Sequence, residues 1–86
     1  MNYVFSDEAW EDYLFWQKTD PKKVKRINEI ILDIARNPYT GIGKPEPLKH
    51  KYQGFWSRRI DEEHRLIYQP TKDSILIAKC RFHYDK

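Results

Sequence analysis

Apolar residues recur at helical spacing in the first part of the chain. Within residues 7–18, one face of a helix would carry Ala9, Trp10, Tyr13, Leu14 and Gln17. Ser6 precedes this stretch and two carboxylates open it. This is a typical helix start, because the hydroxyl accepts from unpaired amides and acidic groups favour the positive end of the helix dipole. The pattern predicts a first helix over residues 7–18.

A second amphipathic stretch follows at once. Asp20 can cap it, and Pro21 is tolerated at the first helical position, where the missing N–H would have no partner in any case. Its apolar face is made of Val24, Ile27, Ile30, Ile31 and Ile34. Because Asn37-Pro38 cannot easily continue a helix, the segment should end near Arg36. The two helices are expected to form an antiparallel hairpin.

The rest of the chain has the pattern of a small sheet. Residues 3–5 predict a short first strand, and residues 37–47 are a loop rich in proline and glycine. Residues 55–60, 64–68 and 74–81 are rich in β-branched and aromatic residues. The linkers between them are too short for crossover helices, so these strands should pair antiparallel. The order predicts a two-layer α+β domain over residues 1–86, with a twisted, mainly antiparallel sheet and both helices on one face.

Composition narrows the class of protein. The chain has 86 residues, 40% of them hydrophobic and 15% aromatic, so one domain with a small core is expected rather than disorder. No stretch is long enough to span a membrane, and no basic segment precedes an apolar one at the N-terminus, which predicts a cytoplasmic protein. The one cysteine, Cys80, stands in an apolar run, where a buried structural thiol is the common role.

Charge is distributed unevenly. The net charge of +3 permits an anionic partner without requiring one. Alternation along the last strand places Leu76, Ala78, Cys80, Phe82 and Tyr84 toward the helices, and Ile75, Ile77, Lys79, Arg81 and His83 on the open face. Antiparallel pairing then predicts a basic cluster at one edge of that face, made of Arg59, Arg65, Arg81 and His83. The proline-rich loop is expected to bring Glu46 and Lys49 over this cluster.

Such a cluster suits RNA cleavage without a metal. The 2′-hydroxyl of a nucleotide attacks its own 3′-phosphate, which needs a base, a cation for the growing negative charge and an acid for the departing 5′-oxygen. A structural interpretation stands beside this one, because arginines on strands commonly stabilise an exposed sheet face or protect an edge. His50 and His64 are as available as His83 by composition, and Trp10, Trp16 and Trp56 are better explained as core residues. The residues alone indicate a compact α+β domain with a basic face.

Four motifs in the second half, and one in the first, extend this interpretation. They are GKPEPLKH at 43–50, GFWSRRI at 54–60, EEHRLIY at 62–68, CRFHY at 80–84 and WEDYLFWQ at 10–17. Together they closely resemble the YoeB (Txe) toxins of the RelE superfamily, over nearly the whole chain. The resemblance implies a fold like that of microbial ribonucleases and the toxin of a type II toxin–antitoxin system. It implies an enzyme that cuts mRNA in the ribosomal decoding site and needs no metal or other cofactor.

The resemblance also implies roles for individual residues. Glu46 would be the general base, His83 the general acid and Arg65 the group that stabilises the phosphate in the transition state. Tyr84 would position the RNA, Lys49 and Arg59 would contact phosphates, and Glu63 would help to shape the site. The implied partners are the ribosome with its mRNA and a YefM-like antitoxin whose acidic, partly disordered segment folds over the toxin. A homodimer is left open.

Two other hypotheses fit the basic face. The chain could be a binding module that sits on ribosomal RNA and stops translation without cutting, in which case mRNA would stay whole. Alternatively, the basic face could serve chiefly to hold an acidic partner chain, in which case expression without that partner would be harmless.

Overall fold

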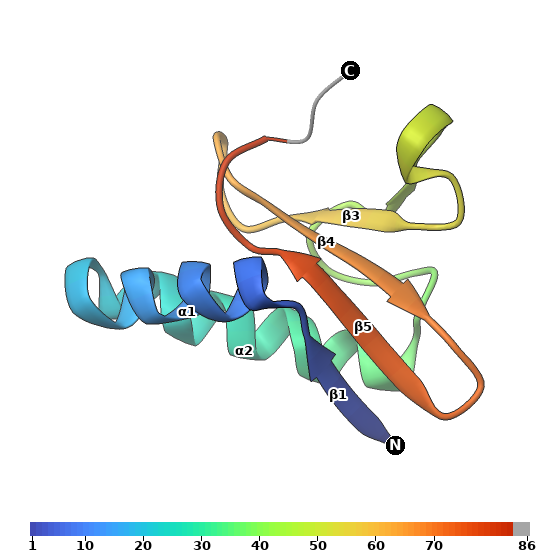
Figure 1. Ribbon diagram of the computed structural model, residues 1–86, viewed down its shortest axis with the longest axis horizontal. Coiled ribbons are helices and arrows are strands. Elements are labelled where there is room, and N and C mark those ends of the chain that lie inside the picture. The colour runs from blue at the N-terminus through green and yellow to red at the C-terminus, as the bar shows by residue number, and fades with distance from the viewer. Residues whose placement is uncertain (84–86) are drawn as a thin grey trace.

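A computed structural model describes residues 1–83. A short strand β1 (Asn2–Phe5) precedes two helices, α1 (Asp7–Thr19) and α2 (Pro21–Arg36). After them come β2 (Glu46–Pro47), a 3-10 turn η1 (His50–Tyr52), β3 (Trp56–Arg59), β4 (Arg65–Pro70) and β5 (Ser74–Lys79). The strands form one sheet in the order β1-β5-β4-β3-β2, and the helices pack side by side on one of its faces (Figure 1). The predicted α+β architecture is confirmed.

Both helices begin as their caps predict. The Ser6 hydroxyl accepts from the backbone amide of Ala9 at 3.0 Å, and Asp20 Oδ1 accepts from the amide of Lys22 at 3.2 Å. Pro21 occupies the first turn of α2, and the helix ends at Arg36 as expected. Within residues 1–83, neither helix is long and apolar enough to cross a membrane.

The sheet contains two edge strands whose partners the sequence does not predict. Strands β3, β4 and β5 form the expected antiparallel meander, and β1 joins the outer edge of β5 in parallel. In the predicted loop 37–47, Glu46 and Pro47 pair antiparallel with β3. Two residues are too few to show alternation, and a proline is tolerated there because β2 is an edge strand. This pairing fixes where Glu46 stands.

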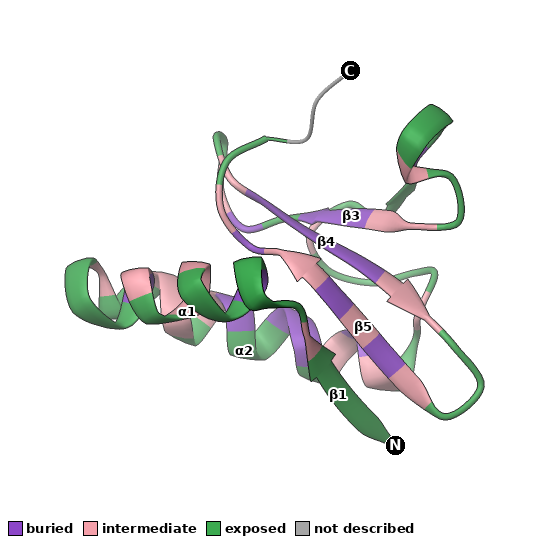
Figure 2. Cartoon of the chain, in the orientation of Figure 1, coloured by how far each residue is buried: buried purple, intermediate pink, exposed green. Residues whose placement is uncertain are grey.

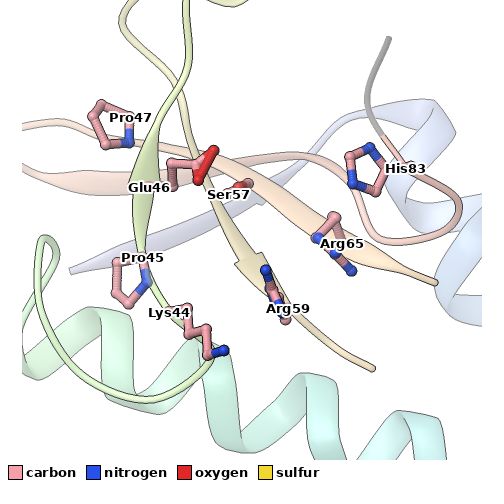
Figure 3. A pocket seen from close by; sticks show the side chains of 8 residues that line it. All are labelled: Lys44, Pro45, Glu46, Pro47, Ser57, Arg59, Arg65 and His83. Atoms are coloured by element: carbon pink, nitrogen blue, oxygen red, sulfur yellow. The ribbon is translucent and has the colours of Figure 1, made fainter. Parts of the chain in front are cut away.

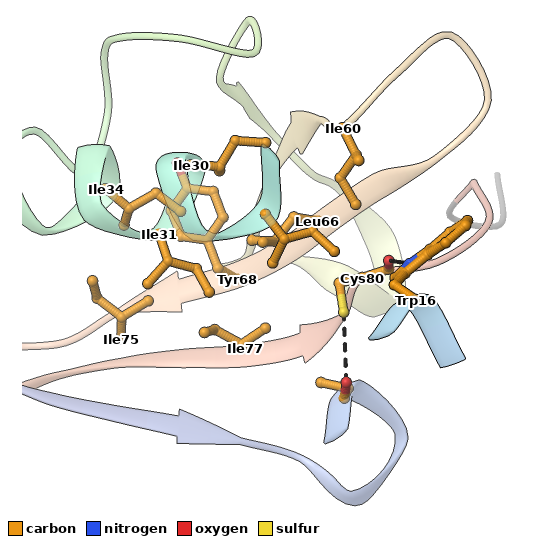
Figure 4. Close-up of a cluster of buried hydrophobic side chains, with 12 residues drawn as sticks. Trp16, Ile30, Ile31, Ile34, Ile60, Leu66, Tyr68, Ile75, Ile77 and Cys80 are labelled. Atoms are coloured by element: carbon orange, nitrogen blue, oxygen red, sulfur yellow. Dashed lines mark hydrogen bonds between the residues drawn. The ribbon is translucent and has the colours of Figure 1, made fainter. Parts of the chain in front are cut away.

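The core lies between α2 and the central strands. Ile27, Ile30, Ile31 and Ile34 of α2 are buried in one cluster with residues of β4 and β5 (Figures 2 and 4). The predicted face of α1 is partly wrong. Trp16 is buried and its Nε1 donates to the Cys80 carbonyl at 2.8 Å, whereas Trp10 and Leu14 are 49% and 43% exposed. Trp10 instead stacks on Tyr13 at the surface, with ring centroids 5.9 Å apart.

The facing of the last strand is also corrected. Ile75 and Ile77, predicted on the open face, are buried in the helix-side core, and Leu76 is only half-buried. Tyr68 pairs with Ile77 whereas Ile67 pairs with Lys79, so β5 carries one extra residue, Ala78. Because of this bulge, the residues after Ala78 face the side opposite to the one that simple alternation from Ile75 and Ile77 would give. Cys80 is therefore buried in the core. The predicted burial of the Cys80 thiol is therefore confirmed, but for a different reason.

A buried arginine ties the proline-rich loop to the core. The Arg58 side chain is fully buried, and its Nη1 donates to Asp33 Oδ2 at 2.6 Å. The guanidinium also donates to three loop carbonyls and to a phenol oxygen, which belong to Asn37, Thr40, Ile42 and Tyr68. The hydrogen bond from Arg58 holds the pKa of the Asp33 carboxyl below its ordinary value. The loop that ends in Glu46 is thus anchored at several points before β2 begins.

Candidate functional site

A hollow of about 250 Å³ opens on the sheet face opposite the helices. Its lining comes from the proline-rich loop, β2, β3, β4 and the C-terminal segment: Lys44, Pro45, Glu46, Pro47, Ser57, Arg59, Arg65 and His83. In the view of Figure 3, the side chains of Arg59 and Arg65 stand between those of Glu46 and His83. One carboxylate, three cationic groups and one imidazole therefore share a small polar depression.

The strand register explains why these residues meet. Arg59 on β3 is the direct partner of Arg65 on β4, and Glu46 on β2 is the partner of Ser57 on β3. Ser57 and Arg59 project on the same side by alternation, while Arg58 between them points into the core. Like charges directly opposite one another on a sheet repel. The Arg59–Arg65 pair is therefore a place where a bound anion would relieve repulsion.

Arg65 is held rigidly. Its side chain is buried, and Nη1 donates to the carbonyls of Asp61, Glu62 and His64 at 2.8, 3.2 and 3.1 Å. These bonds fix the guanidinium in the turn between β3 and β4. Arg59 is exposed, and its backbone amide donates to the Gly43 carbonyl at 2.6 Å. One arginine is thus fixed at the base of the hollow while the other is accessible to a ligand.

His83 reaches the hollow from an irregular segment. Strand β5 ends at Lys79, and the chain then turns past the start of β4 (Figure 1). The Phe82 carbonyl accepts from the Arg65 amide at 3.0 Å, and the Phe82 amide donates to His64 Nδ1 at 2.8 Å. Main-chain bonds on the residue before His83 therefore place the imidazole beside Arg65.

Other predicted site residues lie elsewhere. Lys49 is exposed at the start of η1, and Glu63 is 77% exposed with its carboxylate 3.5 Å from His64 Nε2; neither lines the hollow. Tyr84 lies outside the described residues. The predicted grouping of Arg81 with Arg59, Arg65 and His83 is wrong, because the guanidinium of Arg81 stacks 3.5 Å from the centroid of the Phe15 ring. The chain has left the sheet by this point, so strand alternation no longer orients Arg81.

Sequence reasoning missed two polar residues of the hollow. Lys44 adopts a left-handed backbone conformation with φ of 52°, and Ser57 is buried beneath Glu46 in the strand register. Alternation from Arg59 would have indicated Ser57. Lys44 carries no such signal, since its place depends on how the loop folds back on β3. The five segments together bring a carboxylate, an imidazole and cationic groups into one hollow, and the roles of individual residues stay predictions.

Comparison with known proteins shows the family of this chain. A family model described as YoeB-like toxin of bacterial type II toxin–antitoxin system matches residues 5–84. The chain is 63% identical to Toxin YoeB of Escherichia coli O6:H1 over 84 residues, which cover 98% of this chain and all of that protein.

Solved structures agree as well. A YoeB/ParE toxin from Agrobacterium tumefaciens superimposes with a TM-score of 0.94 at 45% identity, covering 98% of this chain and 100% of that one. A heterotetrameric YoeB-YefM toxin–antitoxin complex and a YoeB dimer, both from Staphylococcus aureus, contain chains 49% identical to this one. Their TM-scores are 0.91 and 0.92, with 98% of each chain covered. The chain therefore belongs to the YoeB-like toxins of bacterial type II toxin–antitoxin systems.

Proposed function

We propose that this toxin is a metal-independent endoribonuclease that cuts mRNA in the ribosomal decoding site and thereby stops translation. The observation that carries the proposal is the meeting of Glu46, Arg65 and His83 in one hollow, although they come from an edge strand, a central strand and the C-terminal segment. A purely structural role for these residues would not require them to converge. Membership of a toxin family supports an activity directed at an essential process.

The chemistry follows from the groups present. Glu46 takes the proton of a 2′-hydroxyl, whose oxygen attacks the adjacent 3′-phosphate. Arg65, with Arg59 beside it, binds the phosphate and stabilises the charge that grows on it. His83 gives a proton to the 5′-oxygen as its bond to phosphorus breaks. The products are a 2′,3′-cyclic phosphate on one fragment and a 5′-hydroxyl on the other.

Residues at the rim would extend the contact with RNA. Lys49 and Lys44 are exposed cations close in sequence to Glu46, which suits them to neighbouring phosphates. Phe82 is 55% exposed beside His83, so its ring is available to stack on an unpaired base, and Tyr84 has the same role in the proposal. Glu63 contributes through His64 rather than by lining the hollow.

The partners follow from the same surface. A YefM-like antitoxin with an acidic segment would neutralise the arginines of the hollow, in line with the YoeB-YefM complex from Staphylococcus aureus. A homodimer is proposed on the strength of the YoeB dimer from that organism. The site of action, the translating ribosome, makes the toxin cytoplasmic.

Primer extension in a purified translation reaction tests the proposal. Wild-type toxin should produce new mRNA ends within the decoding site, and only when ribosomes are present. His83→Gln should abolish these ends, whereas His50→Gln, which changes an exposed histidine that does not line the hollow, should leave them unchanged. Intact mRNA with halted translation would refute cleavage and favour a binding module. Unimpaired translation without the antitoxin would refute both and favour a module that only holds its partner.

A further inference from the structure

The segment that carries His83 lies outside the sheet and has a strained backbone. Phe82 adopts a left-handed backbone conformation with φ of 64°, which is unfavourable for a residue with a large side chain. Its side chain is 55% exposed, so burial contributes little to holding it. The segment also lies beyond the end of β5 at Lys79. Two hydrogen bonds made by the Phe82 main chain stabilise this conformation, beside the contacts of the Phe82 ring with Arg81 and His64.

One of those bonds ends on a side chain. The Phe82 carbonyl accepts from the Arg65 backbone amide at 3.0 Å, which any residue but proline at position 65 could supply. The Phe82 amide donates to Nδ1 of His64 at 2.8 Å, and this acceptor exists only because position 64 is a histidine. Since Nδ1 accepts, the proton of the neutral ring sits on Nε2, which faces the Glu63 carboxylate at 3.5 Å.

The His64 ring is itself immobilised. It packs edge-on against Trp16, with centroids 4.8 Å apart and the planes at 79°, and only 12% of its side chain is exposed. Trp16 is anchored in turn, because its Nε1 donates to the Cys80 carbonyl at 2.8 Å. The His64 amide donates to Asp61 Oδ1 at 2.6 Å, which fixes the backbone beneath the ring. A rigid imidazole is thus presented to the Phe82 amide, in the segment that carries His83.

We propose that His64 is a positioning residue, which holds the general acid His83 in the hollow by accepting a hydrogen bond from the Phe82 backbone amide. The proposal rests on the ribonuclease function proposed above for the adjacent site. His64 does not line the hollow and does not touch the RNA; it acts through the main chain of its neighbour. A displacement of a catalytic group by about 1 Å can reduce a rate on the order of 100-fold.

Two variants of His64 separate the hydrogen bond from the bulk of the ring. In His64→Asn the amide oxygen is bonded to Cγ, as Nδ1 is in histidine, so an acceptor remains near the Phe82 amide. His64→Leu has no acceptor. We expect kcat on ribosome-bound mRNA to fall roughly 10- to 100-fold in His64→Leu, with KM within about three-fold of wild type, and His64→Asn to recover most of the loss.

Hydrogen exchange of the Phe82 amide, followed by NMR in the free toxin, gives a readout that needs no RNA. This amide should be protected in wild type and in His64→Asn, and should exchange at least about 10-fold faster in His64→Leu. If His64→Leu does not fold, His64→Gln replaces it, because its amide lies one methylene further out and should not reach the Phe82 amide.

The outcomes are distinct. Cleavage by wild type that persists at the same kcat in His64→Leu would overturn the positioning role, and so would equal impairment of the leucine and asparagine variants. An unprotected Phe82 amide in wild type would also overturn it. Failure of the proposed function would show differently, as a wild-type toxin that leaves mRNA intact.

Discussion

Replacing Arg58 with methionine removes the guanidinium from the centre of the molecule while keeping most of the aliphatic stem. The side chain is fully buried and makes five hydrogen bonds, to the Asp33 carboxylate, the carbonyls of Asn37, Thr40 and Ile42, and the Tyr68 hydroxyl. The substitution leaves three loop carbonyls without these donors. The Asp33 carboxylate keeps a bond from the Ile42 amide at 3.0 Å.

The magnitude follows from these contacts. Removing one partner of a buried ion pair costs about 3–5 kcal/mol, because the groups left behind are desolvated without compensation. Asp33 is 21% exposed and recovers some hydration, so a loss of about 4 kcal/mol is expected rather than more. An 86-residue domain has a total stability of about 4–13 kcal/mol. Each kcal/mol lowers the melting temperature of a domain this size by about 4–8 °C, so a fall on the order of 20 °C is predicted.

Urea unfolding followed by tryptophan fluorescence at low temperature measures this change. Arg59→Met is the matched control, because Arg59 is the next residue of the same strand but is exposed, and it should stay within about 0.5 kcal/mol of wild type. The double variant with Asp33→Asn should lose less than the sum of the single losses, since the two residues share one interaction. If Arg58→Met unfolds within about 1 kcal/mol of wild type, the loop is not anchored in the way described.

Three further predictions concern other parts of the fold. Burial raises the pKa of the Asp61 carboxyl, but hydrogen bonds from Lys23 and from the amides of His64 and Glu63 outweigh it and lower the pKa from 3.8 to about 2. The resulting stabilisation of about 1 kcal/mol is present above pH 4 and lost as the pH falls toward 2, so urea midpoints at pH 5 and pH 2.5 should differ less in Asp61→Asn; an unchanged difference would contradict this. Burial, assisted by Asp12, raises the pKa of the Cys80 thiol to about 12. Iodoacetamide should therefore modify Cys80 only in urea, and rapid labelling of the native protein would refute its burial. Gly43 has φ of 80°, and a Cβ there would meet Arg58 Cβ and the Arg59 carbonyl at 3.1 Å, so Gly43→Ala should destabilise the protein by about 1–2 kcal/mol in thermal unfolding; an unchanged melting temperature would show that the turn adapts.

The helices and the central meander were predictable because each rests on a local signal. Ser6, Asp20 and Pro21 mark helix starts by chemistry that acts within a few residues, and the isoleucines of α2 repeat at a helical period. The edges of the sheet carry no comparable signal. Strand β2 is two residues long, and β1 finds its parallel partner β5 across seventy residues of chain. Such pairings depend on the assembled fold.

Two features of the site were hidden for different reasons. The bulge at Ala78 reverses the parity of β5, so simple alternation assigns the wrong face to Ile75 and Ile77 before the bulge and the right face to Cys80 after it. Arg81 was misplaced because β5 ends at Lys79, and strand alternation does not orient a residue beyond the sheet. Arg58 and Arg59 are neighbouring residues of the same type, yet Arg58 is buried and Arg59 is exposed. The Asp33 carboxylate, the Tyr68 hydroxyl and three carbonyls of the distant loop 37–42 make burial of an arginine tolerable, and their positions cannot be deduced from strand periodicity. The roles of Glu46, Arg65 and His83 came from family resemblance, and their convergence in one hollow gives those roles a geometric basis.

The single-turnover rate of cleavage of ribosome-bound mRNA by Glu46→Gln tests most directly whether this hollow is the catalytic site. Glu29→Gln changes another exposed carboxylate, on α2 and outside the hollow, and is the matched control. Loss of a general base should reduce the rate by roughly 10²–10⁴-fold, while the control should cut at the wild-type rate. Cleavage by Glu46→Gln at the rate of Glu29→Gln would contradict the assignment, because the reaction would then have to take place elsewhere on the molecule.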